Sequence, residues 1–217
     1  MSEFEILENS PTRLKIIEAF LEGNEVIEYS FVKDLVEKDT NRPDYHLNLL
    51  VENNLIRRIK GRGNYKLNEP MIQPLRNKYM KKKKVPIYLI GGLGTQLDLY
   101  TDILDALRKV SIIPKTYFLI TSKEIKPQFN KTYKSFSVEI TQTKPILETV
   151  DFQTVLREGY SELYKKFDEI IKKEIYNYEI ICELTGSTKP VTIALMKLAE
   201  KYRLQVIYYS GQKINWI

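Results

Sequence analysis

The stretch Glu183-Leu-Thr-Gly-Ser-Thr-Lys-Pro-Val-Thr-Ile-Ala-Leu-Met-Lys-Leu-Ala199 decides the predicted fold. An apolar run over 178–182 precedes it and is typical of a buried parallel strand, and a helical apolar pattern over 191–198 follows. The start of a helix presents unpaired backbone amides, and its dipole favours an anion there. Gly186 permits a tight turn, and Lys189 adds a positive charge. The sequence predicts an anion-binding turn, with an ordinary turn capped by hydroxyl groups as the alternative.

Residues 85–217 alternate between predicted strands and helices, which indicates an α/β fold with a mostly parallel, Rossmann-like sheet. We expect one long helix from Asp151 to Ile171, with Leu156 among its inward-facing residues. The strands are expected at 87–90, 116–120, 136–140, 178–183 and 204–209, and a further helix at 97–110.

Ligands of such sheets bind beyond the carboxyl ends of the strands, where the strand order reverses. Three loops are expected at that edge: 91–96, 121–124 and 186–190. Their small or polar residues suit phosphate, ribose and adenine groups. The predicted ligand-binding residues are Gly91, Gly92, Gly94, Thr95, Gln96, Thr121, Ser122, Thr185, Gly186, Ser187, Thr188 and Lys189.

The Thr-Gly-Ser-Thr-Lys turn resembles the Thr-Gly-Gly-Thr-Lys signature of CARF domains, the CRISPR-associated Rossmann-fold sensors of cyclic oligoadenylates. Ser187 stands where that family has its second glycine. The resemblance extends over nearly all of residues 85–217. It implies a homodimer that binds one cyclic oligoadenylate, such as cyclic tetra-adenylate, across a two-fold interface, in antiviral defence.

An enzyme is the alternative reading, because some CARF domains are ring nucleases that slowly cleave their ligand. Lys189, Thr95 and Ser187 are then the candidate catalytic residues, and Glu124 is the nearest candidate base. We rank catalysis below sensing, and a sensor for an unrelated nucleotide is the third possibility. An NAD site is disfavoured, because Leu97 replaces the third glycine of the fingerprint and the second strand ends in Thr121-Ser122.

Residues 1–68 show three helical patterns and then two short strands around a glycine-rich tip at 61–64, the order of a winged helix-turn-helix. Second-helix residues Phe31, Leu35 and Val36 are expected to face inward. Residues 45–56 resemble the recognition-helix phrase of bacterial and archaeal regulators. The predicted contacts to double-stranded DNA are Asn41, Arg42, Tyr45, His46, Asn48, Arg57, Arg58, Lys60, Arg62 and Lys66. The alternative is a winged helix that makes protein contacts only.

Charge is unevenly distributed along the 217 residues, whose net charge is +6. Residues 1–53 hold five basic and twelve acidic residues, whereas residues 54–84 hold eleven basic and one acidic. A basic block of this kind favours an anionic partner. We expect a basic, solvated linker over 69–84 between the winged helix and the CARF-like domain.

Composition limits the remaining possibilities. The single cysteine, Cys182, cannot form an internal disulfide, and the only histidine, His46, has no partners at metal-ligand spacing. No apolar run approaches a membrane span. We therefore expect a cytoplasmic protein with no metal or cofactor and no membrane partner. The resemblance to CARF domains implies a cyclic oligoadenylate as its effector.

Overall fold

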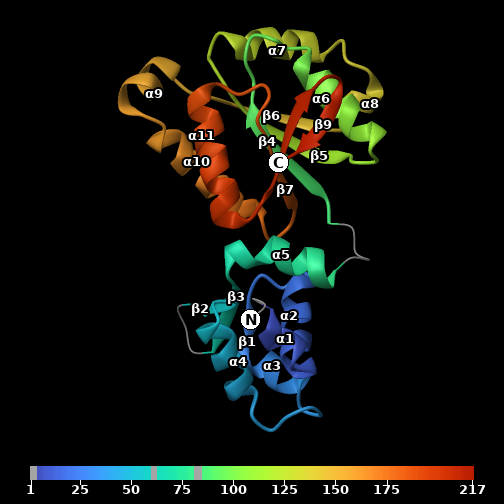
Figure 1. Ribbon diagram of the computed structural model, residues 1–217, viewed down its shortest axis with the longest axis vertical. Helices are drawn as coiled ribbons and strands as arrows, with labels where there is room; N and C mark the ends of the chain where they lie inside the picture. Colours follow the sequence, from blue (N-terminus) through green and yellow to red (C-terminus); the bar gives the residue numbers. More distant parts are fainter. Residues whose placement is uncertain (1–3, 60–62, 81–84) are drawn as a thin grey trace. The chain divides into compact units, whose positions relative to one another are not determined.

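The computed structural model describes residues 4–59, 63–80 and 85–217. The chain divides into two compact units, Met1–Lys84 and Val85–Ile217 (Figure 1). No helix in the described parts of the chain is long and apolar enough to cross a membrane.

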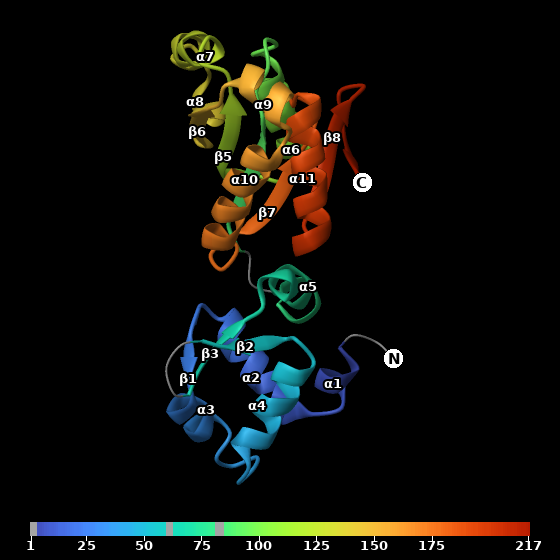
Figure 2. The same cartoon turned by 90° about the vertical axis from the view of Figure 1, so that its left-hand side faces the viewer.

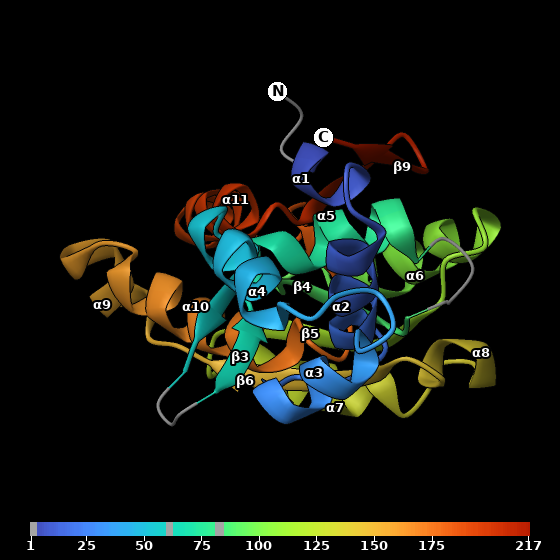
Figure 3. The same cartoon turned by 90° about the horizontal axis from the view of Figure 1, so that it is seen from below.

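The first unit has the predicted order of three helices and a hairpin, with added elements. Its helices α2, α3 and α4 are labelled in Figure 3. They contribute buried core residues that include Ile17, Val32, Leu47 and Leu50. Its strands form an antiparallel sheet in the order β1-β3-β2. The bounds are α1 Glu5–Glu8, α2 Pro11–Leu21, β1 Ile27–Glu28, α3 Tyr29–Leu35, α4 Pro43–Glu52, β2 Ile56–Arg58, β3 Asn64–Leu67 and α5 Glu69–Tyr79.

Helix α5 corrects the prediction of a linker over 69–84. Residues 69–79 are helical, pack against α2, and bury Met71, Ile72 and Leu75. Pro70 lies in the first turn, where no helical amide bond is lost, but Pro74 lies inside the helix. The burial of the apolar face outweighs the cost of the two prolines. Residues 81–84 of the predicted linker lie outside the described residues.

The second unit is an α/β fold with a six-stranded, mostly parallel sheet in the order β6-β5-β4-β7-β8-β9. Strands β6, β5, β4, β7 and β8 are parallel, and β9 is antiparallel to β8 (β5, β7 and β8 are labelled in Figure 2). The bounds are β4 Ile87–Gly92, α6 Leu99–Lys109, β5 Pro114–Thr121, α7 Ile125–Tyr133, α8 Val138–Thr141, β6 Lys144–Thr149, α9 Phe152–Glu158, α10 Ser161–Glu174, β7 Glu179–Glu183, α11 Lys189–Tyr202, β8 Gln205–Ser210 and β9 Lys213–Trp216.

Helices cover both faces of this sheet (Figure 1). On one face, Tyr100 of α6 and Phe129 of α7 pack in one buried cluster with Tyr117 and Ile181 of the sheet. On the other face lie α10 and α11, where the Phe167 ring meets the edge of Phe118 at 6.2 Å. The strand order reverses between β4 and β7, because β5 follows β4 on one side and β7 lies on its other side.

Three details of the predicted elements were wrong. Residues 136–140 are not a strand, because Ser137 caps the short helix α8, and the strand forms later as β6. The long helix is broken at Gly159, whose φ is 86°, and Leu156 is 68% exposed. In α3, Phe31 is 46% exposed and Leu35 is half-buried, so Val32 and Val36 supply the core contacts.

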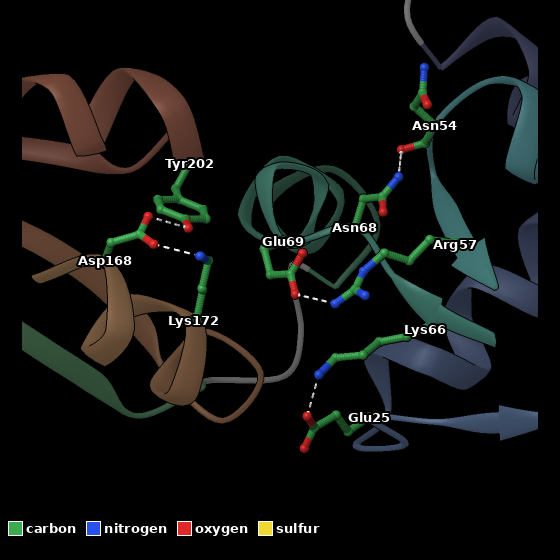
Figure 4. Close-up of polar contacts among 9 residues, drawn as sticks. All are labelled: Glu25, Asn54, Arg57, Lys66, Asn68, Glu69, Asp168, Lys172 and Tyr202. Atoms are coloured by element: carbon green, nitrogen blue, oxygen red, sulfur yellow. Dashed lines mark hydrogen bonds and ion pairs between the residues drawn. The ribbon is translucent and has the colours of Figure 1, made fainter. Parts of the chain in front are cut away.

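An ion-pair cluster joins α10 to α11. Asp168 is buried, and its carboxylate lies 2.5 Å from Lys172 Nζ and accepts a hydrogen bond from Tyr202 (Figure 4). The carboxylate also lies 2.7 Å from Lys201 Nζ. Burial alone raises the pKa of Asp168, but the three hydrogen bonds outweigh it and lower the pKa to about 2. This cluster fixes the two helices on one face of the sheet.

Candidate functional site

The loop after β4 and the turn between β7 and α11 meet at the point where the strand order reverses. A Cβ added to Gly186 would lie 2.6 Å from the Gly92 carbonyl oxygen, and one added to Gly92 would lie 2.9 Å from Ser187 Cα. Real Cβ atoms do not approach other atoms so closely. Gly92 and Gly186 therefore allow two backbone segments to touch, which brings two of the three predicted loops together.

The end of β5 joins the same group of loops. The Leu93 amide donates to the Ile120 carbonyl at 2.9 Å, and the Thr121 hydroxyl donates to the Leu93 carbonyl at 2.8 Å. Thr121 is fully buried, so its hydroxyl serves this link and offers no surface to a ligand. Ser122 is half-buried, and its hydroxyl accepts a hydrogen bond from the Ile125 amide.

Inside the turn itself, Thr185 and Gly186 bind the protein rather than solvent. The Thr185 hydroxyl accepts a hydrogen bond from the Tyr209 amide at 2.7 Å, and the Thr185 amide donates to Glu183 Oε1 at 2.5 Å. The Gly186 amide also bonds to Glu183. Ser187 is half-buried against Gly92, and its Oγ has no hydrogen-bond partner among the described residues.

Thr188 and Lys189 are the exposed part of the turn. Thr188 is the N-cap residue of α11, yet its side chain makes no capping hydrogen bond. Lys189 is the first residue of this 14-residue helix and forms no ion pair with any residue that the structure describes. A free hydroxyl, a lysine and a helix start on one exposed turn suit a negatively charged group.

Thr95 and Gln96 lie further out along the loop after β4. Both are exposed and line an open pocket of about 620 Å³ together with Asp98, Asp102 and Thr132. Gly91 and Gly92 are buried within β4, and Gly94 is half-buried. The predicted ligand residues that are exposed or partly exposed are thus Gly94, Thr95, Gln96, Ser122, Thr185, Gly186, Ser187, Thr188 and Lys189, whereas Gly91, Gly92 and Thr121 are buried.

Glu183 is the residue of this region that the predicted site did not include. It is fully buried at the end of β7, and its side chain lies across Gly91 of β4 toward Tyr117 of β5, whose hydroxyl donates to Glu183 Oε2 at 3.0 Å. Burial raises the pKa of its carboxyl, although hydrogen bonds from Thr185, Tyr117 and Gly186 oppose the shift. A carboxylate placed directly after the apolar residues Ile180, Ile181 and Cys182 and before the turn was the signal in the sequence.

The structure also shows the surroundings of Glu124, which was the candidate base, of the possible metal-binding side chains, and of Cys182. Ser122 donates a hydrogen bond that lowers the pKa of Glu124, which makes that carboxylate a weaker base. Across residues 4–59, 63–80 and 85–217 no group of three His, Cys, Asp or Glu residues could hold a metal ion. Cys182 is buried, and burial raises the pKa of its thiol to about 12.

In the first unit, the predicted DNA-contacting residues fall into two groups. Arg57 is paired with Glu69 at 2.6 Å and Lys66 with Glu25 at 2.5 Å, so these two charges are already balanced within the unit (Figure 4). Lys60 and Arg62 lie outside the described residues.

The second group gathers around α4. The Arg58 guanidinium donates to Asn48 Oδ1 at 2.5 Å, and the Arg42 guanidinium lies 5.5 Å from the centre of the Tyr45 ring. Asn41, Arg42, Tyr45, Asn48 and Arg58 are all exposed. His46 is half-buried, and burial and the neighbouring Arg13 lower its pKa.

The fold therefore defines an α/β protein with a candidate anion site at the switch point of its sheet. No protein-family model matches the chain, and no curated protein is found to be similar to it. Among solved structures, the chain is similar to Can2 from Sulfobacillus thermosulfidooxidans in complex with cyclic tetra-adenylate, at 18% identity and a TM-score of 0.44. The match covers 60% of this chain and 34% of that one, so this chain spans about a third of that protein. Similarity this low assigns neither a family nor a function.

Proposed function

We propose that this protein is a DNA-binding transcriptional regulator that senses a cyclic oligoadenylate through residues 85–217. One observation carries the sensing half of the proposal. The loop after β4 and the turn before α11 touch at the switch point, where they expose Thr188 and Lys189. Open α/β sheets bind their ligands at this position. The resemblance of the turn to the CARF signature supplies the ligand class.

The site suits a ring with repeated phosphates if two copies of the chain share it. A two-fold interface presents each loop twice, so one ring would meet two copies of Lys189. The exposed side chains of Thr95 and Gln96 then lie on the same loop as the glycines that contact the turn, and are available to ribose or adenine groups. We therefore propose a homodimer with one ring for two chains, and cyclic tetra-adenylate as the first ligand to test.

The first unit is proposed to act as a winged helix-turn-helix on double-stranded DNA. Exposed Arg42, Tyr45, Asn48 and Arg58 form one polar surface of α4 and β2, with two cations and side chains that can pair with base edges. Because Arg57 and Lys66 are paired with carboxylates, we assign the phosphate contacts of the described residues chiefly to Arg42 and Arg58.

Native mass spectrometry of the full chain with cyclic tri-, tetra- and hexa-adenylate tests the proposal. We expect a complex of two chains and one ring for one of the three. The linear oligoadenylate of the same length is the control, because it carries the same bases without the two-fold ring. The sensing function is wrong if no ring binds, or if the linear form binds equally well. Loss of ligand mass over time would support the ring nuclease alternative.

A further inference from the structure

The strongest unassigned feature of the second unit is the buried carboxylate of Glu183. It is fully buried, and no Lys, Arg or His of the described residues forms an ion pair with it. Placing an unpaired carboxylate inside a protein is costly unless hydrogen bonds compensate. Such a residue at the base of a candidate ligand site calls for a role that an apolar side chain could not fill.

The contacts of Glu183 define that role. Its Oε1 accepts the Thr185 amide at 2.5 Å, its carboxylate also binds the Gly186 amide, and its Oε2 accepts the Tyr117 hydroxyl at 3.0 Å. A Cβ on Gly91 would lie 3.2 Å from Oε2, so the missing side chain of Gly91 leaves room for the carboxylate. Glu183 thus links β7, β4 and β5 and holds the first two amides of the turn.

Two consequences follow for a bound anion. The amides of Thr185 and Gly186 point inward to Glu183, so an anion at the turn must rely on Thr188, Lys189 and the start of α11. An anion held by Thr188 and Lys189 would also place a negative charge on the same turn whose first two amides bind the buried Glu183 carboxylate. Like charges disfavour each other's ionised form, so the bound anion favours the protonated form of Glu183.

We infer that Glu183 is a positioning residue that holds the anion-binding turn and takes up a proton when an anionic ligand binds there. This inference rests on the proposed ligand site. Protonation is structurally possible, because Oε2 can carry the proton while Oε1 still accepts the Thr185 amide. The titratable group that faces Glu183 is Tyr117 of β5, and the ring of Tyr100 of α6 stacks on the Tyr117 ring at 5.4 Å. Gly91 of β4 also faces Glu183 but has no titratable side chain.

Burial already raises the pKa of Glu183 in the free protein, and the bound anion raises it further. Affinity should therefore increase as the pH falls through the interval between these two pKa values. At its steepest the dependence is about tenfold in affinity per pH unit for each proton taken up. Outside that interval Glu183 contributes no pH dependence.

Calorimetry of the full chain with cyclic tetra-adenylate, in buffers of different ionisation enthalpy, measures the proton uptake directly. We expect uptake of up to one proton per protomer in the wild type at pH values above the ordinary range of a glutamate, because burial raises the pKa of Glu183, and none in Glu183→Gln. The glutamine keeps the shape and the acceptor for the two amides, so the fold is retained. Tyr117→Phe is the matched control that keeps the carboxyl, and its uptake should persist with the interval shifted to higher pH.

The outcomes separate the inference from the proposed function. Wild-type protein that binds the ring without any proton uptake would overturn the inference and leave the sensing function standing. Uptake that persists in Glu183→Gln would place the proton elsewhere and also overturn it. If the wild type binds no cyclic oligoadenylate at any pH, the proposed function fails first. The wild-type measurement alone decides the first case, so the test does not depend on the folding of a variant.

Discussion

Replacing Lys189 with alanine should remove ligand affinity without harming the fold. Lys189 is exposed, begins α11, and has no ion pair among the described residues, so its removal breaks no internal contact. A cation at the start of a helix opposes the helix dipole by about 0.3–1 kcal/mol. The variant should therefore be as stable as the wild type or slightly more stable.

The expected loss of affinity follows from the number of contacts. A hydrogen bond to a charged group contributes about 1.5–3 kcal/mol. In the proposed dimer each ring would meet two copies of Lys189, so the variant loses at least about 3 kcal/mol. Since about 1.4 kcal/mol is a factor of ten, the dissociation constant should rise at least about a hundredfold.

Titration calorimetry of wild type, Lys189→Ala and Lys197→Ala with cyclic tetra-adenylate tests this expectation. Lys197 is exposed on the same helix, and eight residues at about 1.5 Å each place it about 12 Å further along. That distance exceeds the screening length of about 10 Å at 0.1 M salt, so Lys197→Ala controls for net charge. Equal affinities for wild type and Lys189→Ala would refute the anion-binding role of the turn, and equal losses in both variants would reduce it to a general charge effect.

Three further predictions concern DNA binding and stability. Arg58→Ala should weaken duplex binding for all sequences and flatten its salt dependence. Arg57→Ala should change both less, because Arg57 is already paired with Glu69. Fluorescence anisotropy at several salt concentrations measures both quantities, and equal changes in the two variants would contradict the prediction. Because the pKa of Asp168 is lowered to about 2 in the folded protein, its ionised carboxylate should stabilise the fold by about 2 kcal/mol at pH values above about 4. This contribution should be lost as the pH falls from about 4 to about 2. Urea unfolding should show a weaker pH dependence in Asp168→Asn, and identical profiles would refute the ion-pair role. Gly186→Ala should destabilise the protein by about 1–3 kcal/mol, because its Cβ would lie 2.6 Å from a backbone oxygen, while Gly94→Ala, with 3.5 Å to its nearest neighbour, should be tolerated. Equal melting temperatures for these two variants would contradict the close contact.

The sheet of the second unit was predictable because its strands are apolar runs and two of its helices have clear apolar faces. The central strands and α11 were predicted correctly, because their apolar sequence pattern agrees with their burial in the fold. The prediction failed where they disagreed. The apolar pattern of β6 is weak, because β6 is an edge strand of the sheet. An edge strand tolerates a proline such as Pro145, and Ile146 of β6 is 39% exposed. In α5 two prolines concealed a helix that tertiary packing stabilises.

The chemistry of the candidate site was less predictable than its position. Residue types identify hydroxyl groups but not their partners, so the sequence could not distinguish the exposed Thr188 from the fully buried Thr121. Charge has the same limitation. The basic block over 54–84 is real in the sequence, yet Arg57 and Lys66 are balanced by Glu69 and Glu25, and one of these carboxylates comes from the acidic segment.

The glycines of the site are explained by the protein's own contacts before any ligand is considered. Gly91 makes room for the Glu183 carboxylate, and Gly92 and Gly186 let the loop after β4 touch the turn before α11. Because a buried carboxylate and two backbone contacts fix these segments, the turn already has its shape in the free protein. A ligand that binds a preformed turn need not supply the cost of ordering it, so more of the contact energy appears as affinity. In the proposed dimer, selectivity then rests on the exposed groups of these loops, Thr95, Gln96, Thr188 and Lys189, because one ring would meet two copies of each.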